Sequence, residues 1–393
     1  MKIALYSHDA MGLGHFRRNL LLARRFLDSP MVSQALLVAG TPEVSAFPLP
    51  LGVNCLTLPA LRKNANGSYA PRSGGRLSDL IELRSRTLFS ALRTFGPDVL
   101  VVEKHPRGIL CELEPSLAWL SGRARLVLGL RDILDAPEAV SREWTREESF
   151  AAIREYFDAL WIYGDPSLYD PRREYRFPPD IAEKTRFVGY LDPTVRLREE
   201  EARLPRELGD MGKAGLALCL VGGGQDGASL ARRFARALPP GLAGVIITGP
   251  FMPPEDHRKL RRLTDRNANL RVIPFTLSPG AVLRRADRVV SMGGYNTVCE
   301  VLVAGKPLLV VPRIRPREEQ MIRASRLAEL GLLSLMHPDR MTTADLSRWI
   351  RTPVPPSMVP QEVVDFRGLA RLPGILGRTV REQAPLYSLR RTG

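Results

Sequence analysis

Three glycine-rich segments of this chain have the composition of ligand-binding loops. They are residues 12–15 (Gly-Leu-Gly-His), 222–227 (Gly-Gly-Gly-Gln-Asp-Gly) and 291–297 (Ser-Met-Gly-Gly-Tyr-Asn-Thr). Glycine lets another molecule approach the backbone closely, and the N–H groups at a helix start suit phosphate. The first segment would also fit a plain tight turn, because Arg17 replaces the third glycine of Gly-x-Gly-x-x-Gly. The second lacks Gly-Lys-Ser/Thr, so an ATPase is not expected.

Two groups of polar side chains follow the third glycine-rich segment. If a helix begins near Tyr295, Thr297 and Glu300 share one helix face, one turn apart. A carboxylate there could accept hydrogen bonds from both hydroxyls of a ribose, although an ordinary surface charge would give the same pattern. Further along, Glu319 and Gln320 form an acid–amide pair that could hold sugar hydroxyls or simply begin a capped helix.

The composition indicates a globular protein with an excess of positive charge. The 393 residues include 57 Lys and Arg against 42 Asp and Glu, a formal charge of +15. Such an excess suggests an anionic partner, which could be nucleic acid, an acidic membrane surface or a phosphorylated ligand. Diffuse surface charge accounts for it equally well. The hydrophobic fraction of 44% excludes wholesale disorder, collagen and a multi-span membrane protein.

The cysteine pattern and the N-terminus bear on cellular location. The four cysteines are far apart and form no Cys-x-x-Cys pair, which predicts reduced thiols and neither a zinc site nor a disulfide framework. The first apolar run is too short for a signal-peptide core, and no run approaches the length of a membrane-spanning helix. We therefore expect a cytoplasmic protein, and peripheral binding to the inner face of the cell membrane stays open.

Short apolar runs alternate with amphipathic stretches along both halves of the chain. Strands are predicted at residues 2–7, 36–39, 53–58, 98–102, 126–130, 159–163, 185–188, 216–221, 244–248, 270–273, 288–291 and 307–311. Helices are predicted at about 15–27, 78–95, 145–157 (from a Thr-Arg-Glu-Glu capping box), 228–238, 279–285, 295–304, 320–330 and 343–350. This alternation predicts an α/β fold of two Rossmann-like, doubly wound parallel-sheet domains.

The expected domain organisation has four parts. Residues 1–190 form the first domain and residues 214–360 the second. Residues 191–213, dense in Glu and Arg, are the predicted linker, with solvated charges. Residues 361–393 are a tail that could form a helix returning to the first domain.

A basic, loop-like segment at residues 61–76 is a second candidate for contact with an anionic surface. It carries Arg62, Lys63, Arg72 and Arg76 and precedes an amphipathic helix. These cations could attract acidic lipid headgroups, or they could belong to an ordinary solvated loop.

Taken together, the motifs resemble those of the GT-B glycosyltransferases. More narrowly, they resemble the family 28-like branch that includes the N-acetylglucosamine transferase of peptidoglycan lipid synthesis. The resemblance rests on Gly-x-Gly-His, Gly-Gly-Gly-Gln-Asp-Gly-Ala, Ser-x-Gly-Gly-x-Asn-Thr-x-x-Glu and Pro-Arg…Arg-Glu-Glu-Gln, in that order. It is most specific from Leu216 to about Leu330. It implies two domains facing across a cleft, with the acceptor bound by the first and a nucleotide-sugar donor by the second.

The resemblance also implies roles for individual residues. Glu300 would bind the donor ribose, Glu319 and Gln320 would hold hydroxyls of the transferred sugar, and His15 would be the catalytic base. The remaining donor-binding positions would be Gly12, Gly14, Gly223, Gly224, Gln225, Gly293, Gly294, Asn296 and Thr297.

The expected reaction is a single displacement with inversion at the anomeric carbon. His15 would remove the proton of the acceptor hydroxyl, as suits an imidazole near neutral pH, or it would only cap its turn. His8, Asp9 and His105 are secondary candidates. Backbone N–H groups and helix starts can stabilise the negative charge of the leaving diphosphate. The sequence also contains no Asp-x-Asp motif for binding a metal. We therefore expect neither a metal nor another cofactor.

The expected substrates are a UDP-sugar and a glycan or lipid-linked acceptor. Two departures from the relatives leave the exact donor open: Asp226, where a small residue is common, and the bulky Tyr295. The competing interpretations are a nucleotide-sugar epimerase or hydrolase on the same fold and a non-catalytic nucleotide-sugar-binding protein. Nucleic-acid binding is not expected, because aromatic residues are only 7% of the chain and do not cluster with the arginines. The oligomeric state stays open.

Overall fold

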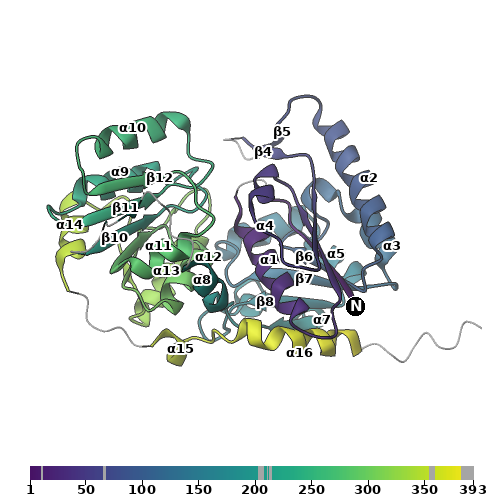
Figure 1. Ribbon diagram of the computed structural model, residues 1–393. Helices are drawn as coiled ribbons and strands as arrows, with labels where there is room; N and C mark the ends of the chain where they lie inside the picture. Colours follow the sequence, from purple (N-terminus) through teal and green to yellow (C-terminus); the bar gives the residue numbers. More distant parts are fainter. Residues whose placement is uncertain are drawn as a thin grey trace, which may run out of the picture.

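The computed structural model describes residues 1–9, 12–64, 68–201, 208–209, 211, 215–353 and 359–381 (Figure 1). Ala10 and Met11 of the first loop, much of the predicted linker, and residues 382–393 of the predicted tail lie outside the described residues.

The first sheet has seven parallel strands in the order β3-β2-β1-β6-β7-β8-β9. Their bounds are β1 Lys2–Tyr6, β2 Gln34–Ala39, β3 Val53–Thr57, β6 Val99–Glu103, β7 Arg125–Arg131, β8 Ala159–Tyr163 and β9 Thr185–Phe187. The uninterrupted apolar runs predicted these strands because both faces of the sheet are buried. The strand order reverses at β1, which has β2 on one side and β6 on the other. In such sheets the ligand crevice opens at the carboxyl ends of the strands that flank this reversal.

Helices cover both faces of the first sheet (Figure 1). One face of β1 packs with Phe16 of α1 and Leu372 of α16, and the other with Leu88 of α2 and Leu117 of α3. The helices of this half are α1 Gly14–Leu27, η1 Pro42–Ala46, α2 Leu77–Phe95, η2 Ile109–Cys111, α3 Glu114–Leu120, α4 Pro137–Arg146, α5 Ser149–Tyr156, α6 Pro171–Glu174 and α7 Pro179–Lys184.

Two local predictions for this half were wrong. The predicted helix at 145–157 is two helices, because α4 already begins at Pro137 and Glu148 takes a left-handed conformation (φ 47°) that separates α4 from α5. The described residues of the segment at 61–76 also include two short strands, which were not predicted. Its residues Leu61–Lys63 (β4) and Tyr69–Pro71 (β5) pair as an antiparallel hairpin.

The second sheet has six parallel strands in the order β12-β11-β10-β13-β14-β15. Their bounds are β10 Leu216–Leu220, β11 Ala243–Ile247, β12 Leu270–Ile273, β13 Arg288–Ser291, β14 Leu308–Val310 and β15 Ser334–Leu335. The edge strand β15 was not predicted, since a two-residue strand carries no periodicity. The order reverses at β10, so the carboxyl ends of β10 and β13 flank the crevice of this domain. The prediction of two doubly wound parallel sheets is confirmed.

The helices of the second half again lie on both faces of their sheet. The cluster around Leu218 includes α11, α12 and α13, whereas the cluster around Cys219 includes α9, α10 and α14. Helix α16 leaves this domain and lies along α1, where Arg25 Nε donates to Leu369 O at 2.9 Å (Figure 1). The bounds are α9 Ala228–Ala237, α10 Pro254–Thr264, α11 Pro279–Arg285, α12 Tyr295–Val303, α13 Glu319–Glu329, α14 Thr343–Arg351, α15 Pro360–Val363 and α16 Gly368–Arg381.

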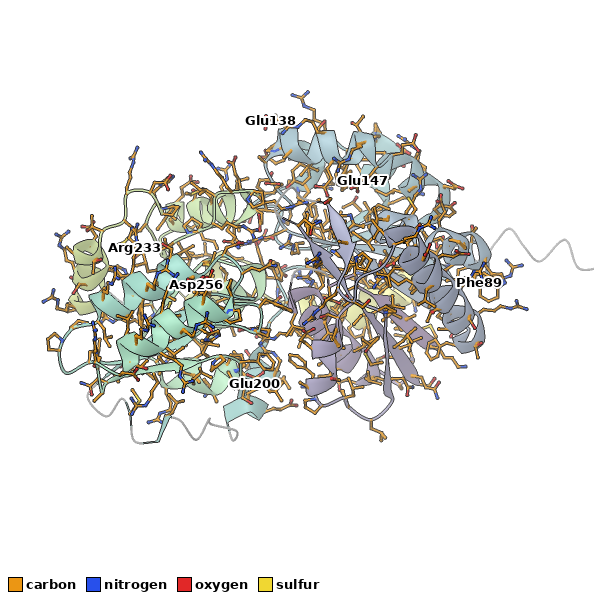
Figure 2. All side chains as sticks on the ribbon, turned by 90° about the horizontal axis from the view of Figure 1, so that it is seen from above. Phe89, Glu138, Glu147, Glu200, Arg233 and Asp256 are labelled. Carbon is orange, nitrogen blue, oxygen red and sulfur yellow. The ribbon has the colours of Figure 1, made fainter. Side chains whose placement is uncertain are left out.

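The described part of the predicted linker contains two charged side chains that are not solvated. Residues Thr194–Glu201 form α8, and Figure 2 shows Glu200 on this helix at the junction between the two domains. The Arg196 side chain is only 13% exposed, and Glu200 accepts a hydrogen bond from Gly280 N at 2.8 Å. The expectation of solvated charge was wrong for Arg196 and Glu200, which have partners in the second domain. It holds for Arg198 and Glu199, which are exposed.

Buried side chains join the two domains across their carboxyl edges. Asp132 follows β7 in the first domain and pairs with Arg323 of α13 in the second. Beside this pair, the rings of Tyr190 and Tyr295 stack with centroids 5.7 Å apart. One apolar cluster runs through this contact from the first sheet to the second. The two crevices therefore face each other.

Candidate active site

The four sequence motifs meet where the two carboxyl edges face each other. Asn296 Nδ2, at the start of α12, donates to Gly14 O of the first loop at 3.0 Å, which joins the first and third motifs across the domains. Arg313 joins the second and fourth motifs, because its guanidinium contacts Asp226 Oδ2 at 3.1 Å and Glu319 Oε1 at 2.7 Å. Motifs that lie far apart in the sequence thus form one interdomain site.

The first loop is held by Asp9, which was only a secondary candidate for the base. Asp9 Oδ1 accepts from Phe16 N at 3.0 Å, so this carboxylate fixes the start of α1. Burial raises the pKa of Asp9 to about 6. Gly12 (φ 155°) has open space where a side chain would lie, and Gly14 has only Asn296 Nδ2 at 3.8 Å. Both glycines therefore leave room for a ligand beside the backbone.

His15 lies in the crevice beside a buried carboxylate. Its Nδ1 is 3.2 Å from Glu103 Oε1 and 2.9 Å from Arg18 Nη2. Burial lowers the pKa of His15 to about 4, against the opposing effect of Glu103, so the imidazole is neutral at physiological pH. Although burial raises the pKa of Glu103, Arg18 and His15 outweigh it and bring this pKa down to about 2. Glu103 is therefore ionised, and sequence reasoning missed it because it reads as the last residue of a strand.

The imidazole ring of His8 lies next to that of His15, and the ring of His105 lies next to that of His8. The ring centroids of His8 and His15 are 5.4 Å apart, and those of His8 and His105 are 4.9 Å apart. Both secondary candidates are buried, and His8 Nδ1 and His105 Nε2 have no partner in the described part of the chain. Burial lowers the pKa of both rings. Polar atoms left unpaired in this way mark where substrate groups could bind.

In the second loop, glycine is partly required by close packing within the second domain. A side chain on Gly224 (φ 96°) would come within 2.1 Å of Thr248 O. Gly223 O accepts from Phe251 N at 2.9 Å. Gln225 is exposed. The structure thus places these three residues at the carboxyl end of β10 and explains Gly224 without a ligand.

The third loop leads into α12, which begins at Tyr295 as predicted. A side chain on Gly293 (φ 78°) would come within 2.6 Å of Val310, and the Gly293 carbonyl accepts from Arg323 Nη1 at 3.2 Å. Gly294 has open space around it, and Thr297 is half-buried. Of these glycines, Gly294 is the one that leaves room for a ligand.

Glu300 lies in the interdomain crevice and is 4% exposed. Its Oε1 accepts from Arg17 Nη2 of the first domain at 3.1 Å and from Arg196 Nη2 of α8 at 2.6 Å. Among the described residues, the hydrogen bonds to this carboxylate all go to Oε1. The sequence did not indicate that Arg17 and Arg196 contact Glu300. Both contacts form only when the two domains pack against each other. The carboxylate is oriented by them with Oε2 left for a ligand.

Glu319 and Gln320 lie side by side at the start of α13 but differ in their contacts. Gln320 Oε1 accepts from Arg313 N at 2.9 Å and so shapes the preceding loop. Glu319 is 3% exposed, and its Oε2 has no partner among the described residues. Although burial raises the pKa of Glu319, Arg131 and Arg313 outweigh it and lower this pKa. Glu319 is thus an ionised acceptor with one free oxygen in the crevice.

The two unusual residues, Asp226 and Tyr295, both have structural partners. Asp226 pairs with Arg313, as described above. The buried Tyr295 ring lies between the guanidinium groups of Arg18, 5.3 Å from its centroid, and Arg323, 5.7 Å from it. Tyr295 therefore packs the interdomain contact, which explains its size at this position.

Among the described residues, one group of side chains could hold a metal ion by geometry. His105, Glu143 and Glu147 offer ligand atoms within 4.8 Å of one another. Arg317 Nη2 already lies 2.9 Å from Glu143 Oε2, however, so the protein supplies a cation of its own to this carboxylate.

A family model matches the second half of the chain. Residues 218–365 match the glycosyltransferase family 28 C-terminal domain, and this range contains three of the four motifs. This part of the chain is therefore similar to the C-terminal domain of glycosyltransferase family 28. The family 28 resemblance predicted from the motifs is confirmed.

A curated relative is similar to part of the chain. The UDP-N-acetylglucosamine–N-acetylmuramyl-(pentapeptide) pyrophosphoryl-undecaprenol N-acetylglucosamine transferase of Phenylobacterium zucineum (strain HLK1) is 30% identical over 172 residues. That match covers 42% of this chain and 46% of the relative. The chain thus spans about half the length of this curated relative.

Solved structures extend the likeness to the first domain. The calicheamicin glycosyltransferase CalG4 superposes with a TM-score of 0.58 at 18% identity, over 98% of this chain and 99% of that one. The UDP-GlcNAc 2-epimerase from Neisseria meningitidis, bound to UDP-GlcNAc, gives 0.59 at 14% identity, over 97% and 100%. At such identities the likeness establishes the fold, and the predicted GT-B architecture is confirmed.

Proposed function

We propose that this family 28 protein is a glycosyltransferase that moves a sugar from a UDP-sugar to an acceptor hydroxyl, with inversion and without a metal. The observation that carries the proposal is the position of Glu300. Its carboxylate is buried in the interdomain crevice, is oriented through Oε1 by two arginines, and keeps Oε2 for a ligand. Such a carboxylate can accept hydrogen bonds from ribose hydroxyls.

His15 is the proposed catalytic base, and its tautomer decides whether it can act. If Nδ1–H donates to Glu103, Nε2 carries a lone pair and can take the proton of the acceptor hydroxyl. If Arg18 instead donates to Nδ1, the proton sits on Nε2 and the ring cannot act as a base there. The ionised Glu103 favours the first tautomer, so its proposed role is to orient His15.

The other predicted residues would contact different parts of the donor. The open positions at Gly12, Gly14 and Gly294 would let the diphosphate approach the backbone, whose N–H groups can meet the charge that develops on the leaving group. The free Oε2 of Glu319 would accept from a hydroxyl of the transferred sugar. Attack by the acceptor oxygen then forms the new glycosidic bond as the bond to the diphosphate breaks, and His15 holds the released proton.

The names of the relatives support the choice of donor. The Phenylobacterium relative is named for UDP-N-acetylglucosamine, and the epimerase structure contains UDP-GlcNAc. The same epimerase supports a second candidate function, the conversion of a nucleotide sugar without any acceptor. Incubation with UDP- and GDP-sugars alone separates the two, because rapid turnover of donor without an acceptor favours the epimerase or hydrolase.

The proposed acceptor is a glycan or a lipid-linked sugar bound by the first domain, at or near the inner face of the membrane. Among the described residues no helix combines the length and apolarity needed to cross a bilayer. The proposal is tested first with the donor. A UDP-sugar that binds the folded protein raises its melting temperature, and UDP should do so as well. If neither UDP nor any UDP-sugar stabilises the protein, the proposed donor is wrong.

A further inference from the structure

Glu300, the carboxylate proposed for the donor ribose, has one of its two oxygens fully engaged by the protein. Arg17 of α1 and Arg196 of α8 both donate to Oε1, at 3.1 Å and 2.6 Å. A carboxylate oxygen offers about two lone-pair positions, so these two donors fill Oε1. The two neighbouring hydroxyls of a ribose can each bind a separate oxygen of one carboxylate. One arginine must therefore leave Oε1 before Glu300 can accept from both hydroxyls in this way.

The space beside Glu300 is too small for a pentose. The cavity there has a volume of about 20 Å³, which is room for about one water molecule. Its lining includes Arg17 of the first domain, Arg196 of α8 and Glu300 of the second domain. A ribose can therefore enter beside this carboxylate only if a side chain around the cavity moves.

Arg17 is the less firmly held of the two arginines. Among the described residues, its guanidinium makes no hydrogen bond other than the one to Glu300, and its side chain is 23% exposed. Arg196 also donates to Glu200, which is itself held by Gly280 N at 2.8 Å. Two carboxylates therefore hold Arg196, whereas a single hydrogen bond holds Arg17.

The balance of burial and charge also distinguishes the two arginines. Burial lowers the pKa of Arg17, and the opposing effect of Glu300 does not restore it. Burial lowers the pKa of Arg196 too, but Glu300 and Glu200 outweigh it and hold this pKa above its usual value. The protein thus stabilises the charge of Arg196 and compensates that of Arg17 only in part. A partly buried cation in this situation is stabilised by a further anion nearby.

The diphosphate of the donor would bring such an anion to Arg17. Gly14 and Arg17 lie three residues apart on α1, so they share one face of the helix, and side chains on a helix point back toward its N-terminus. Gly14 O accepts from Asn296 Nδ2 at 3.0 Å, where the loops of the two domains meet. The proposed diphosphate position beside Gly14 and Gly294 is therefore one helical turn from Arg17, in the direction of its side chain.

We propose that Arg17 exchanges partners when the donor binds, leaving Glu300 to the ribose and pairing with the diphosphate. This inference rests on the proposed glycosyltransfer, because it needs a nucleotide-sugar donor in the crevice. The contact between Arg17 and Glu300 competes with the ribose, and the contact between Arg17 and the diphosphate favours the donor. Arg17 thus selects a nucleoside diphosphate over a nucleoside that lacks the phosphates.

The test compares the binding of uridine and of UDP to the full chain by equilibrium titration. Arg17→Met removes the competing cation, so uridine should bind about two- to fivefold more tightly, the scale of a partly exposed ion pair. It also removes the contact with the phosphates, so the ratio of UDP affinity to uridine affinity should fall about tenfold or more. Arg17→Lys keeps the charge and should preserve most of this ratio. Melting temperatures verify that each variant is folded.

Two further variants show whether the effects come from this contact. Arg24→Met is the matched control, because Arg24 lies on the same helix and pairs with Glu199 of α8, which is 56% exposed. This variant should change neither the uridine affinity nor the ratio. In Glu300→Gln the charge that holds Arg17 is already gone, so adding Arg17→Met should no longer tighten the binding of uridine.

Uridine affinity that is unchanged or weaker in folded Arg17→Met would overturn the inference, because Arg17 would then not compete for Glu300. An unchanged ratio of UDP affinity to uridine affinity would also overturn it, because the phosphates would then not contact Arg17. The same shifts in Arg24→Met would reduce both effects to a change in net charge. In each of these cases UDP binding by wild type leaves the proposed donor intact. If neither wild type nor Arg17→Met binds UDP, the proposed donor is itself wrong.

Discussion

Asp132 and Arg323 join the two domains through a two-pronged ion pair. Arg323 Nε lies 2.7 Å from Asp132 Oδ2, and Nη2 lies 2.6 Å from Oδ1. Both side chains are buried, and Tyr190 and the Gly293 carbonyl satisfy further hydrogen-bonding groups of the pair. Burial alone would lower the pKa of Arg323, but Asp132 outweighs it and holds this pKa above its usual value. The geometry of the crevice depends on this contact.

We expect Asp132→Asn to destabilise the folded protein by about 3–5 kcal/mol, because it leaves the buried Arg323 charge without its partner. The free energy of unfolding in urea measures this loss. The control is Asp180→Asn, which breaks the exposed pair between Arg154 and Asp180 and should give no resolvable change. A loss below about 1 kcal/mol for Asp132→Asn would show that the pair does not hold the domains together.

Glu300→Gln should weaken the binding of UDP about 10- to 100-fold, because an amide replaces the charged acceptor for the ribose hydroxyls. Calorimetric titration with UDP measures the effect. Glu199→Gln is the control, since Glu199 lies on α8 and pairs with Arg24 while 56% exposed. Unchanged UDP affinity in Glu300→Gln would contradict the ribose assignment and the function built on it.

The sequence predicted what depends on local pattern. Both sheets followed from uninterrupted apolar runs. The glycines before Tyr295 marked the start of α12, which put Thr297 and Glu300 on one helix face. The spacing of the motifs gave the order of the loops along the chain. A buried parallel strand or a helix start leaves its signature within a few neighbouring residues.

The sequence did not predict what depends on the docking of the two domains. Nothing near Arg196 or Arg17 indicates that both meet Glu300. Arg196 and Glu200 were expected to be solvated because their partners come from distant segments. Glu103 looked like one more strand residue until Arg18 and His15 were placed beside it. Electrostatic partners in a crevice are set by tertiary structure, which a single-sequence pattern does not contain.

His15→Ala should lower kcat by about 100- to 10,000-fold and leave UDP affinity unchanged, as expected for loss of a general base. Glu103→Gln should also lower kcat, because the tautomer of His15 would no longer be fixed. Since burial lowers the pKa of His15 to about 4, the wild-type rate should rise with pH through about 4 and stay level toward neutral pH. Full transfer by His15→Ala with normal donor binding would assign the base elsewhere, with His8 and His105 as the next candidates.

His15 should also make the protein less stable in acid. Its pKa is about 4 in the folded protein against 6.5 in the unfolded chain, so unfolded molecules bind more protons as the pH falls. The stabilising contribution is complete above pH 6.5 and declines as the pH falls to about 4, by at most about 3 kcal/mol. Unfolding free energies between pH 7 and 4 should therefore fall less steeply in His15→Asn than in wild type. Equal slopes would contradict the pKa assigned to this ring.

The basic hairpin at residues 61–76 should direct the protein to anionic membranes. Arg72 is paired with Glu43 at 2.6 Å, and Arg76 lies 3.8 Å from Asp79, whereas Arg62 is exposed without an ion pair in the described part of the chain. Each unpaired cation near an acidic surface contributes about 1 kcal/mol, so Arg62→Gln should reduce vesicle binding about fivefold.

Sedimentation with vesicles of anionic and of neutral lipid, at low and at high salt, measures this binding. Binding to the anionic vesicles should weaken as salt screens the charges. The control is Arg351→Gln, an exposed change on α14 in the other domain, which should leave binding unchanged if the hairpin is the contact surface. Equal partitioning of wild type into neutral and anionic vesicles would remove the membrane contact, and equal losses in both variants would show that net charge, rather than the hairpin, sets the binding.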